Sequence, residues 1–323
     1  MSFFAKATFV VGASLVASSL SAQDLTVRLG HVTQTSHPFH IGAQMYADKV
    51  SELSQGSIKI ELYPARQLGD DRQLLEGIQL GTVDMAVISS AIFGGATPLM
   101  DSLQLPFLIT DYAQLAEAFT SDEGKALLDG LSDIGVAGLG YYEGGQRHFL
   151  SKADTVTMID DFSGLKTRVV PAKLHLDIWQ AIGVSPTPVA YGEIYSSLQT
   201  GVLDATEINI TSVEGEKLYE VADKLTLTGH YFWPGVLAAN PGFLDRITEG
   251  QRYILIKAAE ETIAPQVQAA SEQDEAALTI LKEQGVEIAD FAELDTMRAK
   301  VKDVSASYEA LDPRIKAFAD AQR

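Results

Sequence analysis

Two kinds of hydrophobic spacing alternate along this chain. Segments such as Leu25–Val32 and Ser57–Tyr63 alternate apolar and polar residues, which is the two-residue period of a half-buried strand. Pro38–Leu53, which lies between them, repeats its apolar residues every three or four positions, as a helix with one buried face does. Strand–helix–strand units favour parallel strands covered by helices. The alternation therefore predicts an α/β fold.

The alternation runs to the middle of the chain and then starts again after the pair Gly144-Gly145. The first set continues with helices at Asp70–Leu80 and Tyr112–Leu131 and strands at Met85–Ile88 and Val136–Tyr142. The second set is predicted to contain strands at Thr167–Val170, Ser185–Val189 and Leu203–Ile208, with helices at Ala172–Ile182 and Gly192–Gln199. A chain of 323 residues is long enough for two cores, so we expect two α/β domains. No internal repeat is visible in the sequence.

A long stretch near the end of the chain, Thr248–Gly285, is almost continuously helical in composition. A helix of roughly 36 residues would run about 54 Å, which is longer than one small domain is wide. Pro265 lies inside the stretch and predicts a bend there. We expect this helix to leave one domain and enter the other. A strand at Val286–Ala289 and a terminal helix from Leu294 onward should follow.

The first residues have the features of a secretory signal peptide. Met1–Lys6 carries one positive charge, Ala7–Leu20 is apolar and uncharged, and the small residues Ser21 and Ala22 follow. The apolar part is too short to span a bilayer comfortably. We expect residues 1–22 to be removed, by cleavage after Ala22 or after Ser21, and the mature protein to reside in the periplasm.

Composition and motifs argue against several functions. The sequence has no cysteine, which excludes disulfides, thiolate metal sites and thiol nucleophiles. Its formal net charge of −19 is unsuited to nucleic-acid binding. No G-x-S-x-G, P-loop or H-E-x-x-H motif occurs. Gly138 and Gly140 fall inside a predicted strand without a following helix, so a dinucleotide fingerprint is lacking. We expect neither a catalytic activity nor a cofactor.

Seven short segments form a recognisable series along the chain. They are Leu29–His31, Leu62–Gly69, Gln79–Met85, Leu105–Leu108, Gly144–Arg147, Gly164–Val169 and Pro188–Asp204. In this order they resemble the solute-binding proteins of tripartite ATP-independent periplasmic (TRAP) transporters, of the type named for dicarboxylate uptake. The resemblance implies a two-domain periplasmic binding protein fold, each domain a central sheet flanked by helices, joined by crossing strands and a long domain-spanning helix.

The predicted elements and the resemblance together imply a division of the chain into domains. Residues 1–22 are the signal peptide. Residues 23–144 and about 233–270 form the first domain, and residues 145–232 and about 271–323 form the second. The ligand is expected to lie between them.

Two arginines are the main candidates for binding a ligand. Arg168 lies on a short predicted strand after Gly164, and its planar guanidinium matches a carboxylate through two parallel hydrogen bonds. The resemblance implies that Arg168 clamps the substrate carboxylate. It also implies that Arg147 makes a second contact to the anion or to a hydroxyl, whereas a salt bridge with Glu143 or with an acidic residue at the hinge is the structural alternative. An acidic protein needs such local positive charge to bind an anion.

Other candidate contacts come from both predicted domains. Tyr191 matches an aromatic residue that covers the ligand in relatives, and a core role is the alternative. Trp233 either walls an apolar side of the ligand or packs at the hinge. From the first domain we expect His31 and Ser89 to contact the ligand.

The chain departs from the family pattern at one place. Many relatives have an asparagine directly after the residue that corresponds to Glu207, but here Ile208 stands there and Asn209 follows. Because strand residues alternate faces, this shift would point the amide away from the site unless the chain bulges. Either Asn209 still reaches the ligand or a neighbour replaces it, the candidates being Thr206, Glu207 and Thr211.

Three histidines near the end of the first strand, His31, His37 and His40, raise the question of a metal site. No cysteine and no obvious fourth ligand accompany them. We expect hydrogen-bonding or loop histidines there and no metal.

These observations predict a non-catalytic, monomeric periplasmic receptor. It would bind a small organic anion in the inter-domain cleft and deliver it to the membrane subunits of a TRAP transporter. A sugar acid, a dicarboxylate, a related hydroxy acid or a small sulfonate would each offer an anion to Arg168, and the run Gly145–Phe149 favours a hydroxylated acid. The alternatives are an enzyme acting on an acidic sugar or ketoacid in the same cleft, and a ligand-sensing partner of a receptor.

Overall fold

The computed structural model describes residues 25–323, so the predicted signal peptide lies outside the described residues. The first part of the chain forms two strand–helix–strand units. Their elements are β1 (Leu25–Gly30), α1 (Pro38–Leu53), β2 (Ile58–Tyr63), α2 (Asp71–Leu80) and β3 (Met85–Ser89). Strand β1 pairs in parallel with β2 on one side and with β3 on the other. We call these five elements the first lobe.

The second lobe repeats this architecture. It contains β5 (Lys166–Val169), α5 (Lys173–Ile182), β6 (Ser185–Pro188), α6 (Ile194–Gln199), β7 (Ala205–Asn209) and α7 (Ile210–Gly215). Strand β5 lies between β6 and β7 and is parallel to both. Strands β8 (Lys224–Leu227) and β10 (Glu287–Asp290) extend this side of the sheet, where β8 pairs with β4. The two parallel units confirm the predicted α/β class.

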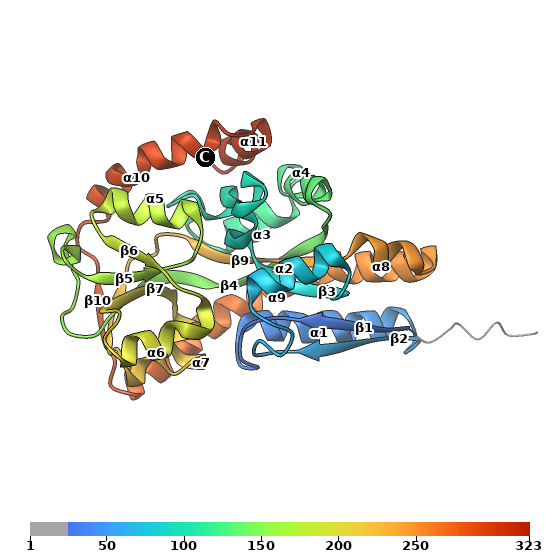
Figure 1. The fold of residues 1–323 in the computed structure, drawn as a ribbon, viewed down its shortest axis with the longest axis horizontal. Helices are drawn as coiled ribbons and strands as arrows, with labels where there is room; N and C mark the ends of the chain where they lie inside the picture. Colours follow the sequence, from blue (N-terminus) through green and yellow to red (C-terminus); the bar gives the residue numbers. More distant parts are fainter. Residues whose placement is uncertain (1–24) are drawn as a thin grey trace, which may run out of the picture.

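Two long strands connect the lobes. Strand β4 (Ala137–Ser151) pairs with β9 (Phe232–Ala239) over its first part and with β7 over its second, giving the order β2-β1-β3-β9-β4-β7-β5-β6. Figure 1 shows β4 and β9 running through the middle of the molecule, between the two lobes. The register shifts between Glu143 and Gln146, and Gly145 adopts φ +122°. A Cβ on Gly145 would lie 2.7 Å from Asp274 Oδ1, so this crossing requires glycine.

A single long helix, α9 (Glu249–Glu283), packs against α1 of the first lobe, against β4 and against α7 of the second lobe. Thr248 caps its N-terminus, and Pro265 lies within it, as the sequence predicts. Helix α10 (Leu294–Glu309) packs on α5, and α11 (Pro313–Ala321) packs on α4 (Asp122–Asp129). The C-terminal pair therefore packs on α5 of the second lobe and on α4, and Figure 1 shows all four helices above β4 and β9 in this view.

Several element boundaries differ from those expected. The helix predicted at Tyr112–Leu131 is two helices, α3 (Tyr112–Thr120) and α4, because Ser121 is extended and its side chain accepts a hydrogen bond from Gly124 N. The terminal helix also divides, because Asp312 caps a new helix that has Pro313 in its first turn. Strand β4 runs well beyond the predicted Val136–Tyr142. Two strands were not predicted: β8 is only four residues long, and β9 lacks the alternation from which strands were predicted.

The structure also shows a repeat that the sequence does not make visible. Helices α2 and α6 both end at a left-handed glycine, Gly81 and Gly201, each with φ +75°. An aspartate follows three residues later in each lobe and accepts a hydrogen bond from the backbone of the neighbouring parallel strand: Asp84 from Arg28 N, and Asp204 from Lys166 N. Too few positions are identical for the repeat to stand out in the sequence. In residues 25–323 no helix is long and apolar enough to cross a membrane. The remaining helix, α8 (Pro241–Arg246), joins β9 to α9.

Candidate functional site

A cavity lies between the two lobes, at the carboxyl ends of strands from both. The empty space between its walls is about 570 Å³, a volume that includes space open to solvent. Strand ends at such a place are the usual location of ligand sites in α/β sheets. Its polar lining is Arg66, Asp70, Asp71, Arg72 and Ser89 from the first lobe, and Arg147 and Arg168 from β4 and β5.

Arg168 is buried near the end of β5 and belongs to the lining of the cavity. Its Nε donates to the carbonyl of Val189 at 2.9 Å, which fixes the plane of the group. Its Nη1 lies 3.8 Å from Glu207 Oε1 and has no hydrogen-bond partner among residues 25–323. Burial lowers the pKa of Arg168 to about 10, so the side chain still carries its charge at neutral pH. A buried charged donor without a partner is suited to receive an anion.

Arg147, in contrast, is fully engaged by Glu207. Its Nε donates to Glu207 Oε2 at 2.5 Å and its Nη2 to the Glu207 carbonyl at 2.9 Å. Burial alone would lower the pKa of Arg147, but the ion pair outweighs burial and raises it. The alternative partner, Glu143, accepts hydrogen bonds from the backbone of Gly145 and Trp233 instead.

Glu207 lies behind both arginines, completely buried. The backbone of Val170 donates to Oε1 at 3.1 Å and the hydroxyl of Tyr231 donates to Oε2 at 3.2 Å. Burial would raise the pKa of this carboxyl, but Arg147 together with neighbouring histidines holds it well below its usual range. Burial in turn lowers the pKa of one of these histidines, His230, to about 4. Two guanidinium groups and one carboxylate therefore leave one positive charge at the cavity wall, which is the charge that a monocarboxylate complements.

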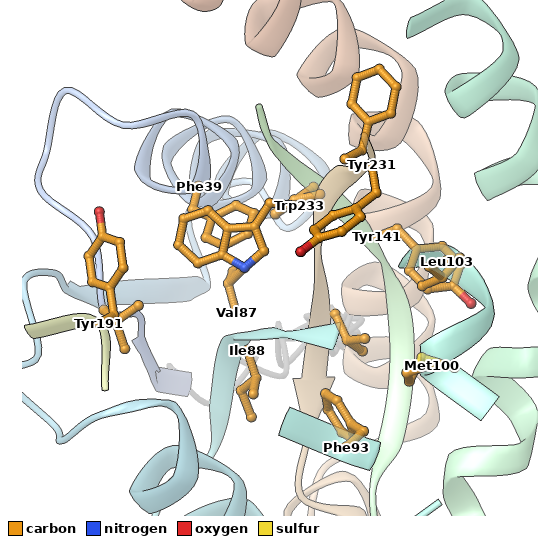
Figure 2. Close-up of a cluster of buried hydrophobic side chains, with 14 of the residues drawn as sticks. Phe39, Val87, Ile88, Phe93, Met100, Leu103, Tyr141, Tyr191, Tyr231 and Trp233 are labelled. Carbon is orange, nitrogen blue, oxygen red and sulfur yellow. The ribbon is translucent and has the colours of Figure 1, made fainter. Parts of the chain in front are cut away.

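Two aromatic side chains line the cavity on its apolar side. The rings of Tyr191 and Trp233 lie 5.3 Å apart between centroids, and Phe39 packs against the other side of Trp233 at 4.8 Å (Figure 2). Trp233 Nε1 donates to Ser89 Oγ at 2.8 Å, which ties the indole to the first lobe. Trp233 thus both lines the cavity and packs at the crossing between the lobes.

Asp71 lines the cavity on the side of the first lobe, in the first turn of α2. Its Oδ1 accepts a hydrogen bond from Ser89 N at 3.0 Å. Burial raises the pKa of Asp71 to about 7, with a further contribution from Asp70. Its position gives the cavity a hydrogen-bonding group on the side of the first lobe.

Replacing Asp71 with asparagine should remove a contribution that makes the free energy of unfolding fall as the pH rises. An aspartate in the unfolded chain ionises near pH 4. Between about pH 4 and pH 7 the folded protein therefore holds a proton that the unfolded chain has lost, and the free energy of unfolding falls as the pH rises. Without this group, urea denaturation between pH 5 and 7 should give a slope of the free energy of unfolding against pH that is more positive than that of wild type, by up to about 1.4 kcal/mol per pH unit.

The exposed Asp48→Asn variant is the control for this measurement and should keep the wild-type slope. Burial also raises the pKa of Asp101 and of Asp274 to about 7, and it lowers the pKa of the buried histidines, which act on the slope in the opposite direction. These groups are present in all three proteins, so the difference between the variant and wild type isolates Asp71. An unchanged slope in Asp71→Asn would contradict the environment assigned to this carboxyl.

Five of the eight residues expected from the sequence line the cavity, and three do not. The five are Arg147, Arg168, Ser89, Tyr191 and Trp233. His31 faces away, because its ring nitrogens contact Thr33 Oγ1 at 3.1 Å and His40 Nδ1 at 3.0 Å. Glu207 stands behind the arginines, as described above.

Asn209 lies at the crossing between the lobes. Its Nδ2 donates to the Gly144 carbonyl at 2.6 Å and also contacts Thr211 Oγ1 and, across the lobes, His37 Nε2. Thr206 and Thr211 are also buried outside the cavity lining. None of the neighbours considered for the place of the asparagine at Ile208 is therefore among the lining residues of this cavity.

Sequence reasoning missed four charged residues of the lining, Arg66, Asp70, Asp71 and Arg72. All four lie in or directly after the segment Leu62–Gly69, whose likeness to the family was noted without assigning it a role. The sequence did offer a signal for these residues. They lie in the predicted turn between the strand Ser57–Tyr63 and the helix Asp70–Leu80 or at the start of that helix, and such a turn in one domain can face the other domain across a cleft. For the histidines considered as metal ligands, the described residues include no group of three or more side chains placed to hold a metal ion.

Comparisons with known proteins agree with this arrangement. The model of the family described as bacterial extracellular solute-binding protein, family 7, matches residues 29–311. The C4-dicarboxylate-binding periplasmic protein DctP of Rhodobacter capsulatus is 32% identical over 284 residues, which is 85% of this chain and 84% of that protein.

Solved structures share the fold over nearly their whole length. The sugar acid binding protein DctPAm from Advenella mimigardefordensis, in complex with galactonate, has a TM-score of 0.89 at 28% identity, covering 93% of this chain and 98% of that one. A TRAP periplasmic solute-binding protein from Sulfitobacter sp. NAS-14.1, with bound β-D-galacturonate, has a TM-score of 0.85 at 28% identity, covering 91% and 98%. The two-lobed α/β architecture, the cavity between the lobes and the match over residues 29–311 establish that this chain belongs to family 7 of the bacterial extracellular solute-binding proteins, the periplasmic receptors of TRAP transporters.

Proposed function

We propose that this protein binds a monoanionic, hydroxylated organic acid of the sugar-acid type and delivers it to TRAP membrane subunits. The observation that carries the proposal is the guanidinium of Arg168, a residue of the cavity lining whose buried Nη1 has no partner among the described residues. The single net positive charge of the Arg147, Arg168 and Glu207 group supports one carboxylate at this wall. A planar carboxylate would accept from Arg168 and displace water from it.

The opposite wall favours hydroxyl groups over a second carboxylate. Asp70, Asp71 and Ser89 line the cavity there beside two arginines, Arg66 and Arg72. The carboxylate of Glu216 already binds Arg66, and a second ligand carboxylate at this wall would lie close to both aspartates. Hydroxyls can donate to a carboxylate and accept from a protonated one. The galactonate and galacturonate bound by the two solved relatives are acids of this kind. The dicarboxylate named for the Rhodobacter relative makes succinate the natural competitor in a test.

The two lobes are joined by β4 and β9, and we infer that they move about these strands when a ligand binds. We propose that residues 23–144 with about 233–270, and residues 145–232 with about 271–323, close on the ligand as two bodies. A ligand that touches both lobes stabilises the closed arrangement differentially, which is the requirement for a shift in population. Closure also removes water and strengthens each charged hydrogen bond.

Isothermal titration calorimetry with D-galactonate, D-galacturonate, succinate and isethionate tests the ligand class. We expect the two sugar acids to bind and succinate to bind more weakly than either. Tighter binding of succinate or of the sulfonate would overturn the assignment. Mass spectrometry of the ligand after long incubation should recover it unchanged, since we propose binding without catalysis, and sedimentation should show a monomer.

A further inference from the structure

One arginine of the cavity lining makes contacts to both lobes. Arg66 follows β2, and its Nη1 donates to the carbonyl of Val32 in the first lobe at 2.9 Å. The same guanidinium donates from Nη1 and Nη2 to the two carboxylate oxygens of Glu216, at 3.1 and 3.2 Å. Glu216 directly follows α7 in the second lobe. The two parallel bonds form the bidentate geometry in which arginine and carboxylate interact most strongly.

The backbone around Arg66 is shaped to hold this side chain in place. Ala65 and Arg66 are consecutive non-glycine residues with positive φ, +51° and +66°. Such conformations are unfavourable for L-residues and persist only where the surroundings impose them. Here Ala65 N donates to the Thr33 carbonyl and Arg66 N to the His31 carbonyl, which fastens the turn to the end of β1.

Arg66 also contacts the aromatic cover of the cavity. Its Cζ lies 5.8 Å from the centre of the Tyr191 ring, and a Cβ on Gly192 would lie 3.0 Å from Arg66 Cδ. On the second lobe Glu216 is mostly buried, and Gln34 of the first lobe adds a third hydrogen bond to it at 3.2 Å. The ion pair is thus partly shielded from solvent, with 27% of the Arg66 side chain and 13% of the Glu216 side chain exposed, and such a pair is stronger than a fully exposed one.

We propose that Arg66 and Glu216 form a latch between the lobes that holds the cavity closed over its ligand and slows ligand release. The proposal rests on the proposed function, because it assumes that the lobes close on a ligand. The Glu216 carboxylate occupies the Arg66 guanidinium, so Arg66 is a positioning residue and Arg168 remains the residue that binds the anion. Opening the lobes would separate the two charges and expose them to water.

Pulsed electron paramagnetic resonance measures the distance between spin labels on the two lobes, so it tests the latch without requiring a ligand. We introduce two cysteines, Ser51→Cys on α1 and Gln199→Cys on α6, at exposed positions on opposite lobes. Because the sequence has no cysteine of its own, the spin labels attach at these two sites alone. We expect Arg66→Gln to shift the distance distribution toward longer values, both without ligand and with saturating D-galactonate. Identical distributions in wild type and variant would overturn the latch.

Stopped-flow kinetics with D-galactonate supply the second readout. Arg66→Gln and Glu216→Gln should each speed dissociation roughly threefold to tenfold, the range for a partly shielded ion pair, and change association much less. The double variant should be no faster than either single one, because both remove the same interaction. If the double variant dissociated faster by the product of the two single increases, the two residues would act separately, which would contradict the proposal.

Arg28 provides a matched control within the first lobe. It also donates to a carbonyl, Thr82 at 3.0 Å, and to a carboxylate, Asp84 at 3.2 Å, but both partners lie in its own lobe. Arg28→Gln should therefore leave the dissociation rate and the distance distribution unchanged. If D-galactonate fails to bind the wild type, the ligand assignment fails, while the distances measured without ligand still decide the latch.

Discussion

Replacing Arg168 with alanine should weaken the binding of D-galactonate by roughly 30-fold to several thousand-fold. Loss of one partner from a desolvated charge pair costs about 2–5 kcal/mol, and each 1.4 kcal/mol changes the dissociation constant tenfold. The reason lies in the geometry. Arg168 presents the one charged donor of the cavity wall that is buried and unpaired within the described residues, whereas Glu207 already neutralises Arg147. Calorimetry on the purified variant measures the effect.

Two further variants separate charge from geometry at this position. Arg168→Lys keeps the charge but loses both the planar fork and the bond from Nε to Val189, so we expect an affinity between those of wild type and alanine. Arg252→Ala removes a half-exposed guanidinium that donates to the Leu244 carbonyl, and it should not affect binding. Wild-type affinity in Arg168→Ala would end the assignment of this side chain as the carboxylate clamp.

Glu207→Gln should reduce stability more than any other single change considered. Removing one partner from a buried ion pair leaves an uncompensated charge and typically costs about 3–5 kcal/mol. Here the glutamine would leave two buried guanidinium groups, Arg147 and Arg168, without a carboxylate between them. For a chain of this size we expect the melting temperature to fall on the order of 10 °C. Circular dichroism during heating measures it.

A second measurement on Glu207→Gln shows whether its loss of stability comes from the uncompensated charges or from a general packing defect. Adding D-galactonate supplies a negative charge to the pair of arginines, so it should raise the melting temperature of Glu207→Gln by more than it raises that of wild type. The exposed pair of Lys257 and Glu261 serves as the comparison, and Glu261→Gln should shift the melting temperature little. If the melting temperature of Glu207→Gln fell as little as that of the Glu261→Gln control, the result would contradict the position assigned to Glu207 between the two arginines.

Much of the architecture could be predicted because it depends on local patterns. The alternating segments at β1 and β2, the helical period of α1 and the cap-to-cap extent of α9 all follow from neighbouring residues. Arg168 and Arg147 were also recognisable as site residues from the short motifs around them. Predictions failed where a single residue ended an element, as Ser121 does between α3 and α4.

The roles of the remaining charged residues required the tertiary structure. Glu207 was expected to contact the ligand, but the structure places it behind the arginines, where its charge decides which of the two is left free. His31 was expected to face the ligand and instead pairs with His40. Arg66 and Glu216 are 150 residues apart in the sequence, and no local pattern indicates that they meet.

The sequence by itself determined the α/β class, because hydrophobic period acts over a few neighbouring residues, and its likeness to a family singled out two arginines that the structure places in the cavity lining. Only the tertiary structure decided which arginine is neutralised, which side chains face the cavity and which contacts join the lobes. Those outcomes depend on distances between strands and loops far apart in the chain, and on burial, which sets how strongly two charges interact once they are brought together.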